Sequence, residues 1–234
     1  MKFSPPSILS GLLGILAPLP CVVCGKPRGS GDSLPQLCRA CAAAIRPLPE
    51  PRCERCGRPL VSEAGACLRC RSKSPDWDEA YPLFDWRGPA GVALAAYKLG
   101  GRPGLARYFA DALEPVIRAR WPDSVLVPVP PRAERLRKQG WDHVELIARV
   151  LEHRGFEVAR VLRRGSSLEQ KKLGLDARRE NALRAYHVME GRAVPRRALV
   201  LDDVYTSGAT AGACSMALRG AGSEKVAFVA IAAD

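Results

Sequence analysis

The sequence contains no long hydrophobic run. A membrane-spanning helix needs about 18–20 consecutive apolar residues, and no apolar stretch among the 234 residues approaches that length. The G-x-x-x-x-G-K-[ST] phosphate loop is also missing, which argues against a nucleoside triphosphatase of that class. Aromatic side chains make up only 6%, and the cysteine-rich N-terminal part has no interleaved aromatic series for stacking nucleic-acid bases.

Acidic residues are also few in comparison with basic residues. The chain has 24 acidic residues against 36 Lys and Arg, a net charge of +12. Such a balance favours anionic partners, either nucleic acid or small phosphorylated ligands. Basic residues spread over solvated faces would give the same total, so the net charge alone does not show that the protein binds an anionic partner. The length suits one domain of ordinary size and a smaller one.

The N-terminal stretch "MKFSPPSILSGLLGILAPLPC" is similar to a short secretory signal. Cleavage of a lipoprotein signal would occur just before Cys21, but Pro20 stands where such cleavage requires a small residue. Cys21 also belongs to a C-x-x-C pair, which would lose its function if Cys21 became the N-terminal residue. We therefore predict a cytoplasmic protein, which a mature N-terminus found at Cys21 would contradict. Five apolar residues have helical spacing instead and predict a short amphipathic helix: Ile8, Leu9, Leu12, Leu13 and Leu16.

Eight of the nine cysteines form four C-x-x-C pairs. Two intervening residues let one tight turn direct both thiolates at a single ion, and two such turns complete a tetrahedral zinc site. "CVVCGKP" at 21–27 recurs as "CERCGRP" at 53–59, each with a glycine that can adopt positive φ after its second cysteine. The repeat predicts two zinc ribbons, the first with Cys21, Cys24, Cys38 and Cys41, the second with Cys53, Cys56, Cys67 and Cys70.

Disulfides are the alternative for an even number of cysteines, and a crossed pairing or the loss of one site is a further one. A reducing cytosol favours metal. Because four thiolates close the coordination sphere, both zinc ions are expected to be structural. Basic residues in the ribbons would permit binding of nucleic acid.

After Cys70 the composition changes, and apolar strands alternate with helical stretches. This order predicts an α/β domain with a mainly parallel sheet flanked by helices. We place the small zinc-ribbon region at 1–74 and the α/β domain at 75–234. The predicted strands are 124–130, 156–164, 197–203 and 225–233, the predicted helices are 91–102, 104–120, 140–155 and 209–222, and residues 77–86 form an edge strand or a packing hinge.

The stretch "LVLDDVYTSGAT" at 199–210 joins a buried strand to a helix. Amides at a helix N-terminus bind anions, and hydroxyl groups in the loop add donors, so a phosphate fits there. Asp202 and Asp203 would repel that phosphate, so they must face another part of the ligand, and vicinal sugar hydroxyls suit a carboxylate pair. Together these features describe a ribose 5-phosphate. A metal-binding strand or a plain polar strand end is the alternative.

"ALVLDDVYTSGAT" resembles the 13-residue motif with which type I phosphoribosyltransferases bind phosphoribosyl pyrophosphate (PRPP). The resemblance implies that Asp202 and Asp203 position the ribose and stabilise its cationic transition state. It also implies PRPP-binding roles for Val204, Tyr205, Thr206, Ser207, Gly208, Ala209 and Thr210. Mg²⁺ is expected to enter together with PRPP.

With the cysteine pairs in front, "VLVPVPPRAERLRKQGWDHVELIAR" and "LEQKKLGLDARRENALRAYHV" resemble the ComF family, which is linked to competence and DNA uptake. That family joins a double zinc ribbon to a type I phosphoribosyltransferase fold, so the likeness covers nearly the whole chain. "YKLGGR" at 97–102 adds a less diagnostic match. One departure is "QGWDH", with Trp141, Asp142 and His143 where the family commonly has R-G-F-N-Q.

By analogy with the fold, the loop after strand 124–130 meets the pyrophosphate. Its basic residues Arg132, Arg135, Arg137 and Lys138 are placed to neutralise the leaving group. Residues 163–181 are a candidate lid, with a solvated basic loop as the alternative. Among the three histidines none is assigned as a general base, although His143 lies nearest the proposed pyrophosphate loop.

The sequence leaves three functions open. The first is transfer of the phosphoribosyl group from Mg²⁺-PRPP to an unidentified acceptor. The second is a non-catalytic sensor of PRPP or a nucleotide. The third is a zinc-ribbon accessory protein for nucleic acid with a vestigial PRPP site, for which single-stranded DNA and proteins of the DNA-uptake machinery are candidate partners.

Overall fold

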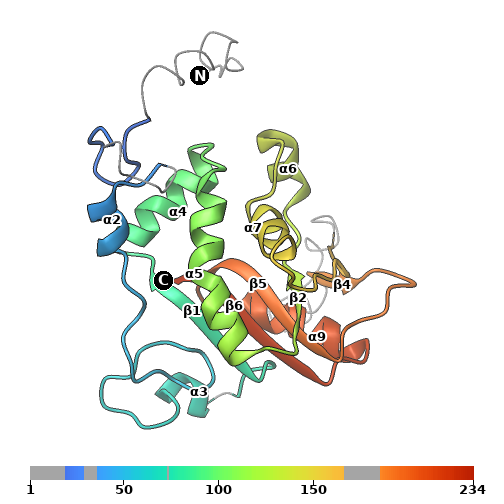
Figure 1. The fold of residues 1–234 in the computed structure, drawn as a ribbon. Helices are drawn as coiled ribbons and strands as arrows, with labels where there is room; N and C mark the ends of the chain where they lie inside the picture. The colour runs from blue at the N-terminus through green and yellow to red at the C-terminus, as the bar shows by residue number, and fades with distance from the viewer. Residues whose placement is uncertain (1–18, 29–35, 73, 166–184) are drawn as a thin grey trace.

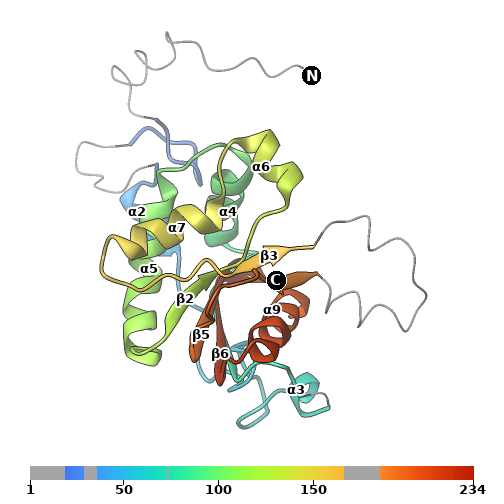
Figure 2. The same cartoon turned by 90° about the vertical axis from the view of Figure 1, so that its right-hand side faces the viewer.

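A computed structural model describes residues 19–28, 36–72, 74–165 and 185–234 (Figures 1 and 2). The predicted N-terminal helix lies outside the described residues. So does most of the candidate lid, including Lys171, Lys172, Arg178, Arg179 and Asn181. Within the described part, no helix has the length and apolar composition needed to cross a membrane.

The centre of the molecule is a four-stranded sheet in the order β1-β6-β5-β2. Its strands are β1 (Glu79–Asp85), β6 (Lys225–Ala233), β5 (Arg197–Tyr205) and β2 (Val125–Pro128). All three pairings are parallel. The predicted α/β class with a mainly parallel sheet is therefore confirmed, and residues 77–86 contribute an edge strand.

Both faces of the sheet are covered, as the continuous apolar character of its strands requires. On β5, Leu199 and Leu201 pack into one cluster of buried residues and Ala198 and Val200 into the other. Phe228 of β6 lies with the second pair. The alternation follows from the period of two in a strand, so one apolar segment supplies two cores.

Helices lie on both sides of the sheet (Figure 2). The first cluster includes residues of α4 (Pro89–Leu99), α5 (Leu105–Arg120) and α7 (His143–Glu152). The second is covered by α9 (Ala209–Gly220). The short helix α6 (Ala133–Gln139) occupies part of the expected pyrophosphate loop.

A separate antiparallel pair, β3 (Leu162–Arg164) and β4 (Tyr186–Val188), adjoins this framework. The strand predicted at 156–164 is therefore broken. Val158 makes one parallel bridge to Leu126, and Leu162 then begins the separate pair.

The two cysteine-rich segments pack against different faces of the sheet. Cys21 and the neighbourhood of α2 (Arg39–Ala44) join the cluster beneath α4 and α5, whereas Cys53 and Cys56 join the cluster beneath α9. Figure 1 accordingly shows α2 beside α4 and α3 (Leu68–Ser72) at the opposite end of the molecule.

The chain between the two segments passes along the exposed side of β1. Pro47 makes an antiparallel bridge to Phe84, and the Leu48 amide donates to the Leu83 carbonyl at 2.8 Å. Arg52 donates to the Pro82 carbonyl at 2.8 Å, and its guanidinium lies 4.2 Å from the centre of the Tyr81 ring. This covering protects a sheet edge that would otherwise present unpaired backbone groups.

Candidate functional site

A cavity of about 330 Å³ opens at the carboxyl ends of β2 and β5. This is where ligands of parallel α/β sheets are expected to bind. Both acids of the motif lie in its wall, together with basic side chains from α4 and from the segment that follows β2. The lining residues are Lys98, Val129, Pro130, Pro131, Arg132, Arg135, Asp142, His143, Val144, Arg164, Tyr186, Asp202, Asp203, Val204, Thr206 and Thr210.

The cavity brings together seven of the residues predicted to form the PRPP site. These are Asp202, Asp203, Val204, Thr206, Thr210, Arg132 and Arg135. Six others do not line it: Tyr205, Ser207, Gly208, Ala209, Arg137 and Lys138. The Tyr205 ring is buried and packs edge-on against Trp77 and Phe228. Arg137 and Lys138 lie in the last turn of α6.

The donor-rich loop (residues 204–210) ends at the N-terminus of α9. Gly208 is the residue before the helix and adopts φ of +79°. A Cβ atom there would lie 2.6 Å from the Trp77 ring, so both the backbone angle and the space require glycine. The Ser207 hydroxyl accepts from the Ala209 amide at 3.3 Å. The loop thus has the form expected of an anion-binding helix start.

Asp203 is held by two basic side chains. Its Oδ2 lies 2.8 Å from Lys98 Nζ and in close contact with His143 Nε2. Burial alone would raise the pKa of Asp203, but the hydrogen bond from His143 and the charge of Lys98 outweigh it and lower the pKa to about 2. Asp203 therefore carries a fixed negative charge at neutral pH.

Asp202 has a different environment. It is buried, and its Oδ1 accepts from the Asp203 amide at 2.8 Å. Burial first, and the adjacent charge of Asp203 second, raise the pKa of Asp202 to about 8. At neutral pH the pair therefore consists of one neutral carboxyl group and one carboxylate, so it offers a donor as well as acceptors.

Three residues of the segment "QGWDH" (139–143) make specific contacts near the cavity. Asp142 caps the N-terminus of α7, where its Oδ1 accepts from the Glu145 amide at 2.5 Å. The next residue, His143, contacts Asp203, and Trp141 packs 5.1 Å from the Tyr97 ring centre. Trp141, Asp142 and His143 thus supply an apolar contact, a helix cap and a partner for Asp203.

Sequence reasoning gave no role to two residues of the cavity wall, Lys98 and Tyr186, and placed a third, Arg164, only at the start of the candidate lid (163–181). Lys98 lies in the weak "YKLGGR" match, which could have indicated it, but its pairing with Asp203 depends on the packing of α4. Arg164 and Tyr186 come from β3 and β4, and Arg164 Nη1 donates to the Tyr186 hydroxyl at 2.9 Å. Only the three-dimensional arrangement shows that these strands border the cavity.

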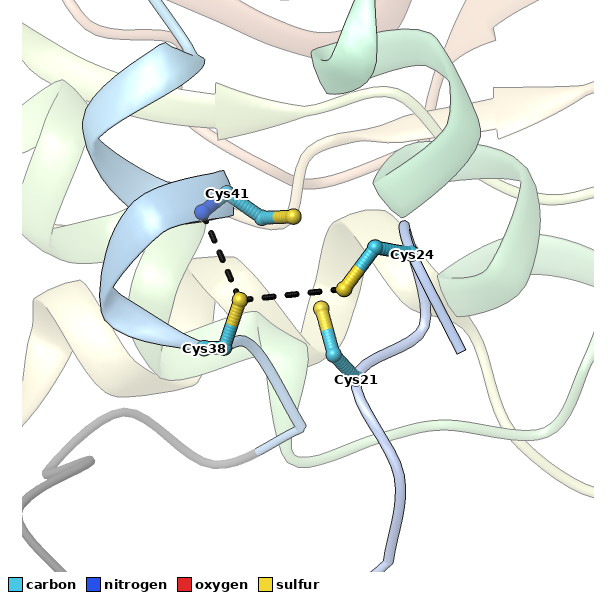
Figure 3. Close-up of side chains that lie close together, drawn as sticks. All are labelled: Cys21, Cys24, Cys38 and Cys41. Carbon is cyan, nitrogen blue, oxygen red and sulfur yellow. Dashed lines mark hydrogen bonds between the residues drawn. The ribbon is translucent and has the colours of Figure 1, made fainter. Parts of the chain in front are cut away.

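The first cysteine cluster contains Cys21, Cys24, Cys38 and Cys41, whose sulfur atoms all lie within 4.8 Å of one another (Figure 3). The sulfurs of Cys24 and Cys38 are 3.8 Å apart. Two thiolates on one tetrahedral zinc, each bonded at about 2.3 Å, are separated by about 3.8 Å. The cluster fits zinc, and the cysteines are not joined in disulfides.

The second cluster consists of Cys53, Cys56, Cys67 and Cys70 and meets the same limit of 4.8 Å. Its Cys56 and Cys67 sulfurs are also 3.8 Å apart. Gly25 and Gly57, the repeated glycines, have φ of +72° and +67°. The predicted pairing of the four C-x-x-C units is confirmed, and the two four-cysteine clusters are consistent with two structural zinc sites.

Comparisons with known proteins agree with this arrangement. Residues 12–71 match the family model of the double zinc ribbon domain. The chain is 26% identical over 203 residues to competence protein F of Haemophilus influenzae, covering 81% of this chain and 87% of that protein. It is 23% identical over 192 residues to competence protein ComFC of Streptococcus pneumoniae, covering 81% and 84%.

Both similarities extend well beyond the zinc ribbons, because each covers about four-fifths of the chain whereas the ribbon match ends at residue 71. They therefore include much of the α/β part that contains the cavity. The resemblance of this chain to the ComF family of competence proteins is confirmed.

Proposed function

We propose that this chain binds Mg²⁺-PRPP at the carboxyl end of β5 and transfers its phosphoribosyl group to a nucleophilic acceptor. One observation carries the proposal. A single cavity joins the Asp202–Asp203 pair, the hydroxyl groups of the donor-rich loop and the arginines of the pyrophosphate loop. A ligand with a phosphate, a sugar diol and a pyrophosphate matches these three groups.

In this proposal the 5-phosphate lies at the start of α9, near Thr206 and Thr210. The ribose hydroxyls face Asp202 and Asp203, which offer a neutral carboxyl group and a carboxylate. Arg132 and Arg135 face the pyrophosphate, where charge-assisted hydrogen bonds are strongest. Mg²⁺ arrives with the pyrophosphate, since it is commonly bound through substrate phosphates and water.

The reaction needs no protein nucleophile. A lone pair on an amine or ring nitrogen of the acceptor forms a bond to C1 of the ribose. The bond between C1 and the pyrophosphate oxygen breaks, and its electron pair leaves with Mg²⁺-pyrophosphate. Positive charge on the sugar is stabilised by Asp203, and negative charge on the leaving group by the arginines.

The test is calorimetry of Mg²⁺-PRPP binding to the wild type and to Asp203→Asn, with pyrophosphate release measured alongside. We expect the variant to bind at least about tenfold more weakly, because a charge-assisted contact is lost. Asp123→Asn is the control, since Asp123 pairs with Arg197 at the amino ends of β2 and β5. Absence of binding by the wild type would refute the proposal, and tight binding without release for any base or amine would support a sensor instead.

The named relatives support a role in competence for this chain. Eight cysteines arranged for metal are compatible with the reducing cytoplasm, which is where we place the protein. We further propose that its partners include single-stranded DNA or proteins of DNA uptake. A host strain carrying Asp202→Asn and Asp203→Asn tests whether this role uses the cavity, and transformation that survives both changes would assign the role to the zinc ribbons.

A further inference from the structure

We propose that the second zinc ribbon (residues 53–72) positions the phosphate-binding amides of the donor-rich loop, with Arg58 and Arg69 as positioning residues. The proposal rests on the proposed function for the identity of the phosphate. It makes the second ribbon a support for the ligand site and separates its role from that of the first.

Two arginines of this ribbon donate to consecutive carbonyl groups of the loop. Arg58 Nη2 lies 2.6 Å from the Thr206 oxygen and 2.5 Å from the Asp234 oxygen. Arg69 Nη2 lies 2.5 Å from the Ser207 oxygen. These contacts join residues 138 to 176 positions apart in the sequence, and each is a charge-assisted hydrogen bond.

The orientation of a carbonyl fixes the orientation of the next amide. In a planar trans peptide the C=O and N–H bonds point in opposite directions. Holding the Thr206 and Ser207 carbonyls toward the ribbon therefore turns the amides of Ser207 and Gly208 away from it. The cavity lies on the side of the loop away from the ribbon, since Thr206 and Thr210 line it and none of its described lining residues comes from the second ribbon.

A third contact acts on the next residue of the loop. Trp77 Nε1 donates to the carbonyl of Arg55, a ribbon residue, at 2.8 Å. The Trp77 ring covers Gly208, where a Cβ atom would lie 2.6 Å away. The second ribbon is in turn fixed to the sheet, since the Ala80 amide of β1 donates to the same Arg55 carbonyl at 2.9 Å. The loop is thereby held between the sheet and the ribbon.

The zinc site supports this arrangement because Arg58 and Arg69 lie next to its cysteines. Arg58 follows Cys56 by two residues, and Arg69 lies between Cys67 and Cys70. Metal binding to the four thiolates orders a segment that has little apolar core of its own. The first ribbon packs beneath α4 and α5, on the other face of the sheet.

The test measures amide hydrogen exchange at Ala209 and Gly212 in the ligand-free, zinc-loaded protein, because these amides donate to the Ser207 hydroxyl and the Gly208 carbonyl of the loop. We expect exchange about tenfold faster in Arg58→Ala and Arg69→Ala, because each loses a hydrogen bond made by a charged group. Arg69→Lys should recover part of the protection. Arg71→Ala is the matched control, since Arg71 donates at 2.6 Å to the Ala64 carbonyl within the same ribbon.

Calorimetry with Mg²⁺-PRPP on the same variants gives the second measurement. Affinity should fall about tenfold in Arg58→Ala and Arg69→Ala and stay unchanged in Arg71→Ala, with melting temperatures close to the wild type for Arg69→Ala. Unchanged exchange in both folded variants, or an equal effect of Arg71→Ala, would overturn the proposal. If the wild type does not bind PRPP, the proposed function fails, but the exchange rates still decide whether the ribbon holds the loop.

Discussion

At the scale of single residues, the most informative feature is the unequal pair Asp202 and Asp203. Two adjacent carboxyl groups at a buried strand end cannot both ionise without a large cost. Of the two acids, Asp203 is the one that pairs with Lys98 and His143, and this asymmetry decides which acid carries the charge. The pairing separates two chemically identical groups into a donor and an acceptor before any ligand arrives.

The first prediction concerns Asp202→Asn and the pH dependence of stability. The pKa of Asp202 is about 8 in the folded protein, against an ordinary value of 3.8 that applies in the unfolded chain. Between these values the folded chain binds more protons than the unfolded chain, so the free energy of unfolding falls as pH rises. Asn removes this loss. We expect the variant to melt about 5 °C or more above the wild type at pH 8, with a difference that shrinks toward pH 4; a difference that grows toward pH 4 would contradict this.

The second prediction concerns Lys98→Gln. Removing one partner of an ion pair leaves the other charge uncompensated. For a fully buried pair this lowers the free energy of unfolding by about 3–5 kcal/mol. Because His143 still contacts Asp203, we expect a loss of about 2–3 kcal/mol at pH 7 in urea unfolding. The loss should decrease in acid, since Asp203 of the variant takes up a proton more readily.

Arg196→Gln is the control for that measurement. Arg196 pairs with Glu224 through two hydrogen bonds of 2.8 Å, but both side chains are exposed. An exposed ion pair contributes about 0–1 kcal/mol. Equal losses in the two variants would show that Lys98 stabilises Asp203 no more than a surface pair does.

At the scale of elements, the junction of β5, the donor-rich loop and α9 carries the third prediction. Gly208→Ala should destabilise the protein by about 2 kcal/mol or more, because alanine disfavours positive φ and its Cβ would meet Trp77. Gly220→Ala lies in the same helix with open space around its Cβ. It should be neutral or stabilise the chain by up to about 1 kcal/mol. Urea unfolding of both variants checks the contrast, and equal effects would contradict it.

The elements themselves differ in how far the sequence predicts them. The sequence predicts the strands at 197–203 and 225–233 because buried parallel strands are continuous hydrophobic runs. It predicts the helices around them from the helical spacing of their apolar residues. The sequence did not predict the short helix α6 or the strand β4, since a mostly polar helix of seven residues and a strand of three carry little periodic signal. The motif predicted which acids and hydroxyls gather, but not that Lys98 reaches Asp203, which depends on how α4 packs.

At the scale of the whole molecule, the two ribbons are not equivalent copies. The sequence repeat makes them look alike, yet the chain between them passes along β1 and places them against different faces of the sheet. The first packs beneath α4 and α5, and the second contacts the donor-rich loop through Arg58 and Arg69. Their separate packing means that each cluster can bind its metal independently.

The last prediction tests this independence by metal content. The wild type should contain about two zinc ions per chain in elemental analysis, because each cluster supplies four thiolates within 4.8 Å. Cys38→Ser should keep the zinc of the second cluster, and Cys67→Ser that of the first, so each variant should contain about one. Three remaining thiolates hold zinc far more weakly, and both variants should melt at lower temperature than the wild type. One zinc in the wild type, or none in either variant, would show that the clusters do not bind metal as two separate sites.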